Sequence, residues 1–166
     1  MTPVRVLGLG SPFGDDRAGW IAVESLLRSE AFRALPEGLA SAEVCDPVGN
    51  NLLDAMRGAS LAILIDAAQS EAAPGTIRRL DAERIENGYE PYSSHGFGLS
   101  ATLALGRALN DLPPNVIIFL IEIPATAEFE PADGPSAPVA EAMPGLIAAV
   151  LSDIRRWAKS GRSITA

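Results

Sequence analysis

Residues 4–27 read VRVLGLGSPFGDDRAGWIAVESLL, and this stretch decides the fold class. Its first part, residues 4–9, is a short apolar run that ends against a glycine, which is typical of a strand. In the part that begins at Asp16, apolar residues recur at helical spacing: Ile21, Ala22, Leu26 and Leu27. The stretch therefore predicts a strand, a glycine-containing loop and a helix that runs to about residue 35.

The rest of the chain continues to alternate between the two kinds of element. Strands are predicted at residues 42–48, 61–65, 76–80 and 116–123, the run at 61–65 buried on both faces and that at 76–80 at an edge. Helices are predicted at 50–56, 99–112 and 139–159, with 81–94 mainly loop. Pro144 is expected to kink the last helix or to mark its true start.

This alternation indicates how the strands are connected. A strand that is followed by a helix and then another strand favours parallel pairing, with right-handed crossovers that cover both faces of the sheet. We therefore predict a single domain over residues 1–166, a three-layer α/β/α sandwich around a twisted, mostly parallel sheet of about five strands.

Composition restricts the partners. A chain of 166 residues with 48% hydrophobic residues can bury one core. Thirteen Lys and Arg against twenty-one Asp and Glu give a net charge of -8, which repels nucleic acid and anionic membrane surfaces. The longest apolar runs fall far short of the roughly 20 residues that a membrane span needs. We expect neither nucleic acid nor a membrane as a partner.

The single cysteine and the N-terminal residues indicate the cellular compartment in which the protein is expected. Cys45 has no second cysteine with which to form a disulfide or a thiolate cluster. The chain enters its first strand-like run without the pattern of a secretory signal. We therefore expect a cytoplasmic protein.

Three ionisable residues follow apolar segments at turns or loops: Asp16, Asp66 and His95. In an open parallel sheet, ligands bind beyond the carboxyl ends of the strands, where neighbouring crossovers diverge. If the strand order begins 2-1-3, Asp16 and Asp66 face the same crevice, and His95 reaches it if the following helix packs beside them.

Two carboxylates and an imidazole form a ligand set that suits Ni, Zn, Mn or Fe. Three protein ligands leave positions open for a substrate or water. Structural roles remain open for each residue: Asp15 or Asp16 as a helix cap, Asp66 as a turn residue and His95 as a surface residue.

Two other sites are disfavoured. A dinucleotide fingerprint needs a glycine where Phe13 stands, and Asp15 and Asp16 would repel the pyrophosphate. A serine hydrolase lacks its nucleophile elbow, and Ser94 beside His95 in the sequence is not a triad assembled in space.

Four short segments occur in an order that characterises one family. Residues 8–19, GLGSPFGDDRAG, resemble a GxGNPxxGDDGxG opening. Residues 65–67, IDA, and 74–76, PGT, resemble its strand-end DA and the PGT that follows, and residues 93–99, SSHGFGL, resemble its SSHG segment. Over nearly its whole length the chain thus resembles the hydrogenase maturation endopeptidases.

The resemblance implies a function and assigns the residues. It implies an endopeptidase that trims the C-terminal extension of a [NiFe]-hydrogenase large-subunit precursor, its protein partner. Asp16, Asp66 and His95 match the family's metal-binding and catalytic acid, aspartate and histidine, which read nickel already inserted in the substrate. No stored cofactor is implied. Asp46 stands where the family often has a DGGT-like segment, and is the candidate for substrate recognition.

Three alternatives stay open. The protein could be a nickel-binding or chaperone-like module that holds the precursor without cutting it. It could be a hydrolase of the same architecture with another substrate, such as a peptidyl-tRNA, although the charge of -8 argues against a basic groove. It could be a zinc peptidase with permanently bound metal.

Overall fold

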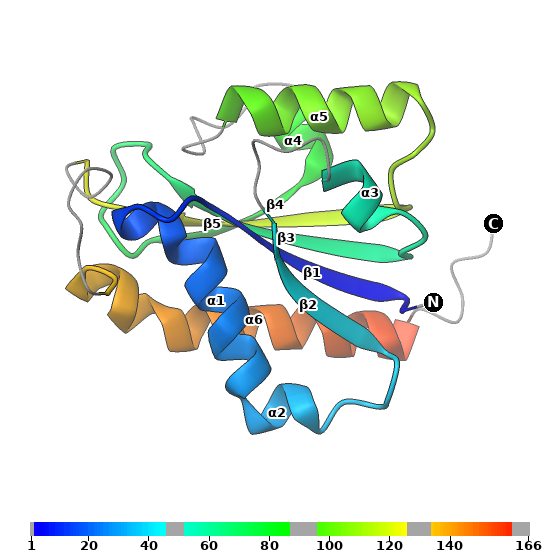
Figure 1. Cartoon of the computed structure of the whole chain (residues 1–166), viewed down its shortest axis with the longest axis horizontal. Coiled ribbons are helices and arrows are strands. Elements are labelled where there is room, and N and C mark those ends of the chain that lie inside the picture. The colour runs from blue at the N-terminus through cyan, green and yellow to red at the C-terminus, as the bar shows by residue number, and fades with distance from the viewer. Residues whose placement is uncertain (1, 46–51, 87–95, 126–133, 161–166) are drawn as a thin grey trace.

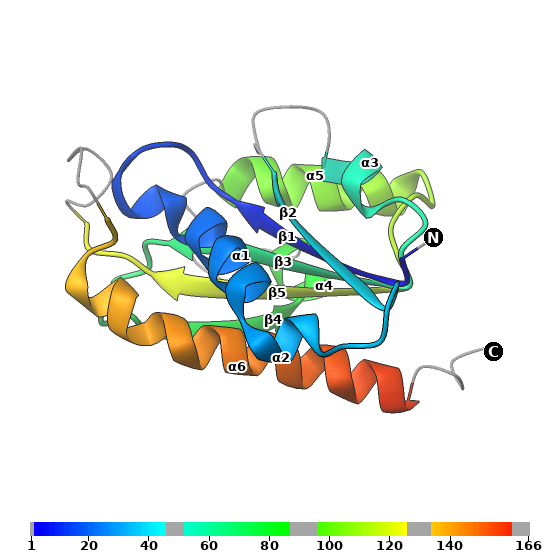
Figure 2. The same cartoon turned by 60° about the horizontal axis from the view of Figure 1, so that its bottom comes forward.

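A computed structural model of the chain describes residues 2–45, 52–86, 96–125 and 134–160 (Figure 1). Its sheet has five strands in the order β2-β1-β3-β5-β4, which Figure 2 shows from β2 at one edge to β4 at the other. Only β4 runs antiparallel to its neighbour. The strands are β1 (Val4–Leu9), β2 (Ala40–Cys45), β3 (Leu61–Ala68), β4 (Ile77–Asp81) and β5 (Asn115–Glu122). The predicted mostly parallel sheet, its 2-1-3 order and the edge position of β4 are confirmed.

Helices cover both faces of the sheet. On one face lie α1 (Ala18–Arg28) and α6 (Ala137–Ser160), and on the other α3 (Leu52–Met56) and α5 (Gly96–Ala108), as Figure 1 shows. Three short elements complete the described chain: the 3-10 turn η1 (Gly14–Arg17), α2 (Glu30–Arg33) and α4 (Ala82–Glu86). The predicted three-layer α/β/α class is confirmed.

The central strand explains why the two helical layers hold together. Every residue of β3 is buried, as the uninterrupted apolar run predicted. Its side chains alternate between two clusters, so that Ile63 and Ile65 pack toward α1 and α6 while Ala62 and Leu64 pack toward α3 and α5. The helices supply the matching apolar faces, with Leu26 from α1, Leu146 from α6 and Leu103 from α5.

The first helix departs from the prediction of one continuous element. The chain forms η1, α1 and α2 in succession, because Ser29 adopts an extended ψ of 134° and ends α1. The Ser29 hydroxyl then accepts a hydrogen bond from the Phe32 amide at 3.1 Å and caps α2. A serine can end one helix and begin the next, which the apolar spacing alone did not reveal.

Two later predictions were also inaccurate. Residues 82–86 form α4, although they were predicted as loop. The last helix begins at Ala137, so Pro144 lies inside it. Of its two predicted roles, marking the start of the helix is wrong, and a kink stays a prediction. Pro144 lies beyond the first turn of α6, so its missing amide hydrogen removes one backbone hydrogen bond inside this helix of 24 residues.

By length and composition α6 could cross a membrane. This is weak evidence, because the core helix of a soluble protein passes the same test. Val150, Leu151 and Ile154 of α6 are buried against the sheet, which accounts for the apolar composition.

Candidate active site at the carboxyl edge of the sheet

Glycine 19 fixes where the first helix meets the sheet. A Cβ on this residue would overlap the backbone carbonyl oxygens of both Leu9 in β1 and Ile65 in β3. The backbone of α1 therefore sits directly on the ends of two neighbouring strands, an approach that only glycine permits. Because α1 packs so closely here, the preceding segment, which carries Asp16, lies over the carboxyl ends of β1 and β3.

Asp16 lies in η1, one turn before Gly19. Its amide donates a hydrogen bond to the Phe13 carbonyl at 3.1 Å, and Gly14 at φ 47° allows the chain to turn there. A Cβ at Gly10 would overlap the Asp16 carbonyl oxygen, so this loop also packs closely on itself. The Asp16 side chain is consequently buried at this edge.

Asp66 reaches the same edge from β3. It was predicted to follow the strand, whereas β3 continues to Ala68 and Asp66 lies inside it. Pairing of β1 with β3 ends at Ile65, so Asp66 stands just beyond the last paired residue, opposite Leu120 of β5. The side chain is fully buried, and its Oδ1 accepts a hydrogen bond from the Ala67 amide at 2.9 Å.

Two buried acids on adjoining elements carry a physical cost. Taking a carboxylate out of water disfavours its charged form unless a cation, a proton or hydrogen-bond donors offset the loss. Asp16 and Asp66 are both buried, and η1 contacts β3. A cation, a shared proton or hydrogen-bond donors can each offset this cost.

Asp15 has a different environment from its neighbour. It is 2% exposed, and its Oδ1 accepts a hydrogen bond from the Ser136 amide at 2.7 Å, just before α6 begins. The N-cap positions of η1 and α1 are Phe13 and Arg17, so neither aspartate occupies the predicted N-cap position. Of the adjacent acids, Asp15 instead ties the loop to the start of the last helix.

Two candidate residues, His95 and Asp46, lie outside the described residues. Asp46 directly follows Cys45, the last residue of β2, and His95 directly precedes Gly96, the first residue of α5. Within the ranges that the structure describes, no three His, Cys, Asp or Glu side chains group closely enough to hold a metal ion. The structure thus brings Asp16 and Asp66 to one edge, and the metal-binding role of all three residues stays a prediction.

Sequence reasoning missed a fourth buried acid near this edge, after Asp15, Asp16 and Asp66. Glu122, the last residue of β5, is 2% exposed and accepts hydrogen bonds from the Ser70 amide at 2.6 Å and hydroxyl at 2.7 Å. It also pairs with Arg78 at 3.4 Å. Glu122 thus anchors the loop between β3 and β4. The sequence offered one signal for this role, namely an acidic residue at the end of an apolar strand.

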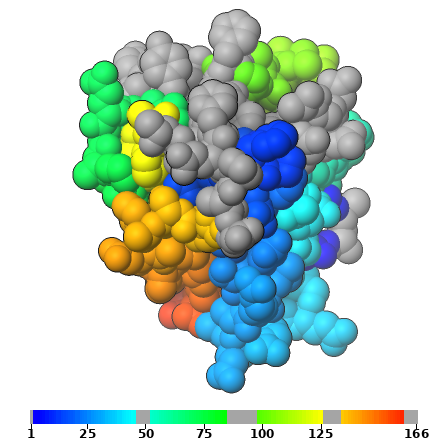
Figure 3. Space-filling model, turned by 60° about the vertical axis from the view of Figure 1, so that its left-hand side comes forward, coloured from blue at the N-terminus to red at the C-terminus, as the bar shows by residue number. Residues whose placement is uncertain are grey.

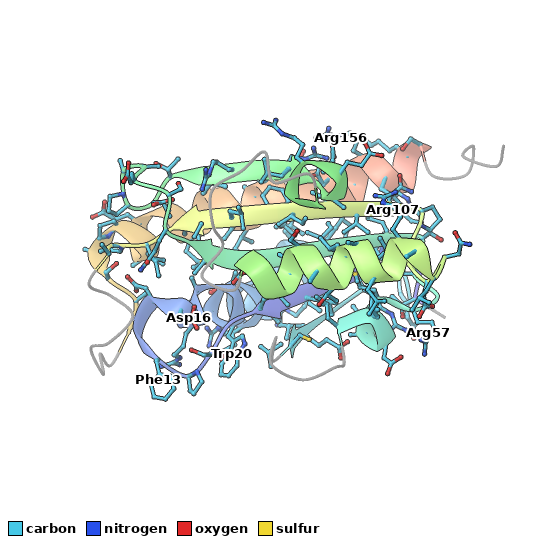
Figure 4. The ribbon with its side chains drawn as sticks, turned by 90° about the horizontal axis from the view of Figure 1, so that it is seen from above. Phe13, Asp16, Trp20, Arg57, Arg107 and Arg156 are labelled. Carbon is cyan, nitrogen blue, oxygen red and sulfur yellow. The ribbon has the colours of Figure 1, made fainter. Side chains whose placement is uncertain are left out.

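Figure 3 looks toward this carboxyl edge. The loop that leads into η1, the loop after β3, the end of β5 and the start of α6 lie around it in blue, green, yellow and orange. Figure 4 shows Asp16 at this end of the molecule and the labelled arginines, Arg57, Arg107 and Arg156, at the other.

A cavity of about 460 Å³ lies at the opposite edge, where β3 and β5 begin. It is lined by Asn115 and by a pairing of Arg79 and Arg156 with Asp153. Since ligands of open α/β sheets bind beyond the carboxyl ends of the strands, this cavity is not the candidate active site.

The fold is an α/β sandwich in which two buried acids, Asp16 and Asp66, lie at the carboxyl edge of the sheet. The family model for hydrogenase maturation protease matches residues 44–153, which is more than half of the chain. The chain therefore belongs to the hydrogenase maturation protease family.

Known relatives agree with this assignment. The hydrogenase expression/formation protein HupD of Thiocapsa roseopersicina is 27% identical over 122 residues, which cover 72% of this chain and 53% of HupD. The match thus spans about half of that relative's length.

Solved structures share the whole fold. The hydrogenase maturating endopeptidase HybD from E. coli superposes with a TM-score of 0.77 and 26% identity, over 94% of this chain and 93% of HybD. The [NiFe] hydrogenase maturation protease HybD from Thermococcus kodakarensis gives a TM-score of 0.67 at 23% identity, over 90% and 97%. The second likeness bears on the fold alone.

Proposed function

We propose that this protein is an endopeptidase that removes the C-terminal extension of a nickel-loaded [NiFe]-hydrogenase large-subunit precursor. The observation that carries the proposal is the burial of Asp16 and Asp66 at one edge of the sheet, in a chain of the hydrogenase maturation protease family. The likeness to the E. coli maturating endopeptidase supports the same activity. A cytoplasmic location fits a protein that acts on a precursor before its maturation is complete.

In this proposal Asp16, Asp66 and His95 bind the nickel that the precursor carries. Carboxylate oxygen and imidazole nitrogen are suitable donors for that ion. Both acids are buried at the same edge, and the charge of a cation delivered by a partner would favour their ionised form. The protein then needs no stored metal. Asp46 is proposed to contact the substrate.

The nickel can position the scissile bond and also assist its hydrolysis. A metal ion polarises a peptide carbonyl or lowers the pKa of an attacking water. The water oxygen bonds to the carbonyl carbon, the C–N bond breaks, and a carboxylate passes the water's proton to the leaving amine. In this mechanism one carboxylate, that of Asp16 or Asp66, accepts the proton, and the other proposed ligands bind the nickel.

The test is to incubate the protein with nickel-loaded and nickel-free precursor and to follow the mass of the precursor. We expect loss of the extension only from the nickel-loaded form. Asp16→Asn, Asp66→Asn and His95→Ala should abolish cleavage, whereas Asp54→Asn, at an exposed acid far from the edge, should not. Equal cleavage of both precursor forms, or full activity of the Asp16 and His95 variants, would overturn the nickel-reading role.

Two further outcomes distinguish the alternatives. A stable complex with the precursor and no change in mass would identify a binding module that does not cleave. Near-stoichiometric zinc in the purified protein, together with cleavage of nickel-free precursor, would identify a conventional zinc peptidase.

A further inference from the structure

Exposed apolar side chains gather next to the candidate site. Among the described residues, Phe13 is 64% exposed and Val44 is 50% exposed. The other large exposed hydrophobic side chains lie elsewhere: Leu27 on α1, Leu105 on α5 and Leu109 just after α5. Exposing a large apolar side chain forgoes the free energy of burying it, so two beside one site favour a docking role.

Phe13 is held in a fixed position relative to Asp16. The Phe13 carbonyl accepts the Asp16 amide at 3.1 Å, which closes the turn between them. The backbone thus directs the Asp16 side chain inward and leaves the Phe13 ring at the surface. Figure 4 shows both residues at the same end of the molecule. The exposed Phe13 ring and the buried Asp16 carboxylate thus belong to one hydrogen-bonded turn.

Trp20 and Val44 continue this surface toward the edge of the sheet. Trp20 lies one helical turn after Asp16, and its Nε1 donates a hydrogen bond to the Cys45 carbonyl at 3.4 Å. This bond brings the half-buried indole against the end of β2, next to Val44. Figure 4 shows Trp20 at the same end of the molecule as Phe13 and Asp16. We call Phe13, Trp20 and Val44 the apolar rim.

The geometry points to the apolar rim as the docking surface for the stretch of the precursor that adjoins the cleaved bond. This inference rests on the proposed function. A peptide bond delivered to Asp16 and Asp66 must cross the carboxyl edge, and the rim occupies that edge from the turn before Asp16 to the outermost strand, β2. The rim offers apolar surface, so the docked stretch presents apolar side chains to it.

The inference is tested with steady-state cleavage of the nickel-loaded precursor. Phe13→Ala and Val44→Ser should each raise KM about tenfold and leave kcat within about twofold, because they remove contact area and no reacting group. Phe13→Leu should restore most of the affinity. Leu105→Ala and Leu109→Ala are the matched controls, since they shorten equally exposed side chains away from the edge. Because the Phe13 side chain is exposed, its variants should fold normally, and thermal unfolding checks that they do.

A binding measurement separates this inference from the proposed chemistry. The chain has two tryptophans, so Trp157→Phe leaves Trp20 as the sole indole reporter. Its fluorescence should change when the precursor is added, and Phe13→Ala should shift that titration to about tenfold higher precursor concentration. If the wild type cleaves and the Phe13 and Val44 variants match the controls, the docking inference is wrong and the peptidase proposal stands. If Trp20 responds through Phe13 and nothing is cleaved, the docking inference stands and the peptidase proposal fails.

Discussion

The carboxylate of Asp153 in α6 accepts a hydrogen bond at 2.7 Å from the Nε of Arg79 in β4. A second guanidinium, that of Arg156, approaches the other carboxylate oxygen at 2.9 Å. Asp153 is only 3% exposed, whereas both arginines reach water. This buried acid therefore links the last helix to the antiparallel edge strand, at the end of the molecule away from the candidate site.

Replacing this acid should lower stability. Asp153→Ala removes the acceptor for both guanidinium groups, and we expect the free energy of unfolding to fall by about 1–3 kcal/mol. Urea denaturation monitors the loss. Asp81→Asn is the control, because the exposed Asp81 lies 3.8 Å from the same Arg79 and such surface pairs contribute about 0–1 kcal/mol. Equal losses in the two variants would contradict a special role for the buried acid.

A second ion pair should make stability depend on pH. The Asp111 carboxylate accepts bonds from the Nε and Nη2 of Arg57 at 3.2 and 2.6 Å. The hydrogen bond from Arg57 holds the pKa of Asp111 below its ordinary value. Below the ordinary aspartate pKa of about 3.9, the unfolded chain therefore binds this proton more readily than the folded one.

The sign of the effect follows from that lowered pKa. The stabilisation is present above the ordinary pKa and is lost as the pH falls through the folded one. The urea midpoint of the wild type should thus exceed that of Asp111→Asn at neutral pH and converge with it as the pH falls below the ordinary aspartate pKa and through the lowered one. Because the pair is exposed, added salt should shrink the difference. A difference that grows toward low pH would contradict this account.

The parts of the fold that could be predicted depend on local pattern. The apolar run of β3 has no polar face, so its residues alone place it at the centre of a sheet. The strand-to-helix order indicates the crossovers, and the carboxyl-edge rule brings Asp16 and Asp66 together. The extent of β3 beyond Asp66 was missed, because the aspartate resembled a stop signal.

The parts that could not be predicted depend on long-range contacts. Asp15 and Ser136 are 121 positions apart, and Glu122 and Ser70 are 52 apart. Spacing within a segment carries no information about such partners. A helix cap was a reasonable expectation for Asp15, but tertiary packing provides that carboxylate with an amide at the start of α6.

A side chain at position 19 should destabilise the packing of α1 on the sheet. Gly19→Ala places a Cβ against the Leu9 and Ile65 carbonyl oxygens, so the helix must move away from the strands. We expect a loss of about 1–3 kcal/mol in the free energy of unfolding and reduced precursor cleavage, because Asp16 moves with α1. Gly98→Ala is the matched control, since a Cβ there meets nothing within 4 Å. It should be neutral or stabilising by up to about 1 kcal/mol.

The loop between β3 and β4 should open locally when Glu122 is replaced. The Glu122 side chain accepts the Ser70 amide and hydroxyl, while its backbone separately bonds Gly75 and Thr76 at 2.8 Å each. Glu122→Ala removes only the side-chain bonds. Hydrogen bonds to a charged acceptor contribute about 1.5–3 kcal/mol, so the Ser70 amide should exchange with solvent deuterium about tenfold faster or more.

Hydrogen exchange with mass spectrometry can confine this effect to the loop. Peptides that cover residues 69–76 should exchange faster in Glu122→Ala, whereas the amides of α6 should keep their wild-type protection. Glu122→Gln should have a smaller effect, because its amide oxygen still accepts a hydrogen bond from Ser70 while the charge opposite Arg78 is lost. Unchanged exchange at Ser70 in the alanine variant would show that the backbone bonds of Glu122 hold the loop without its carboxylate.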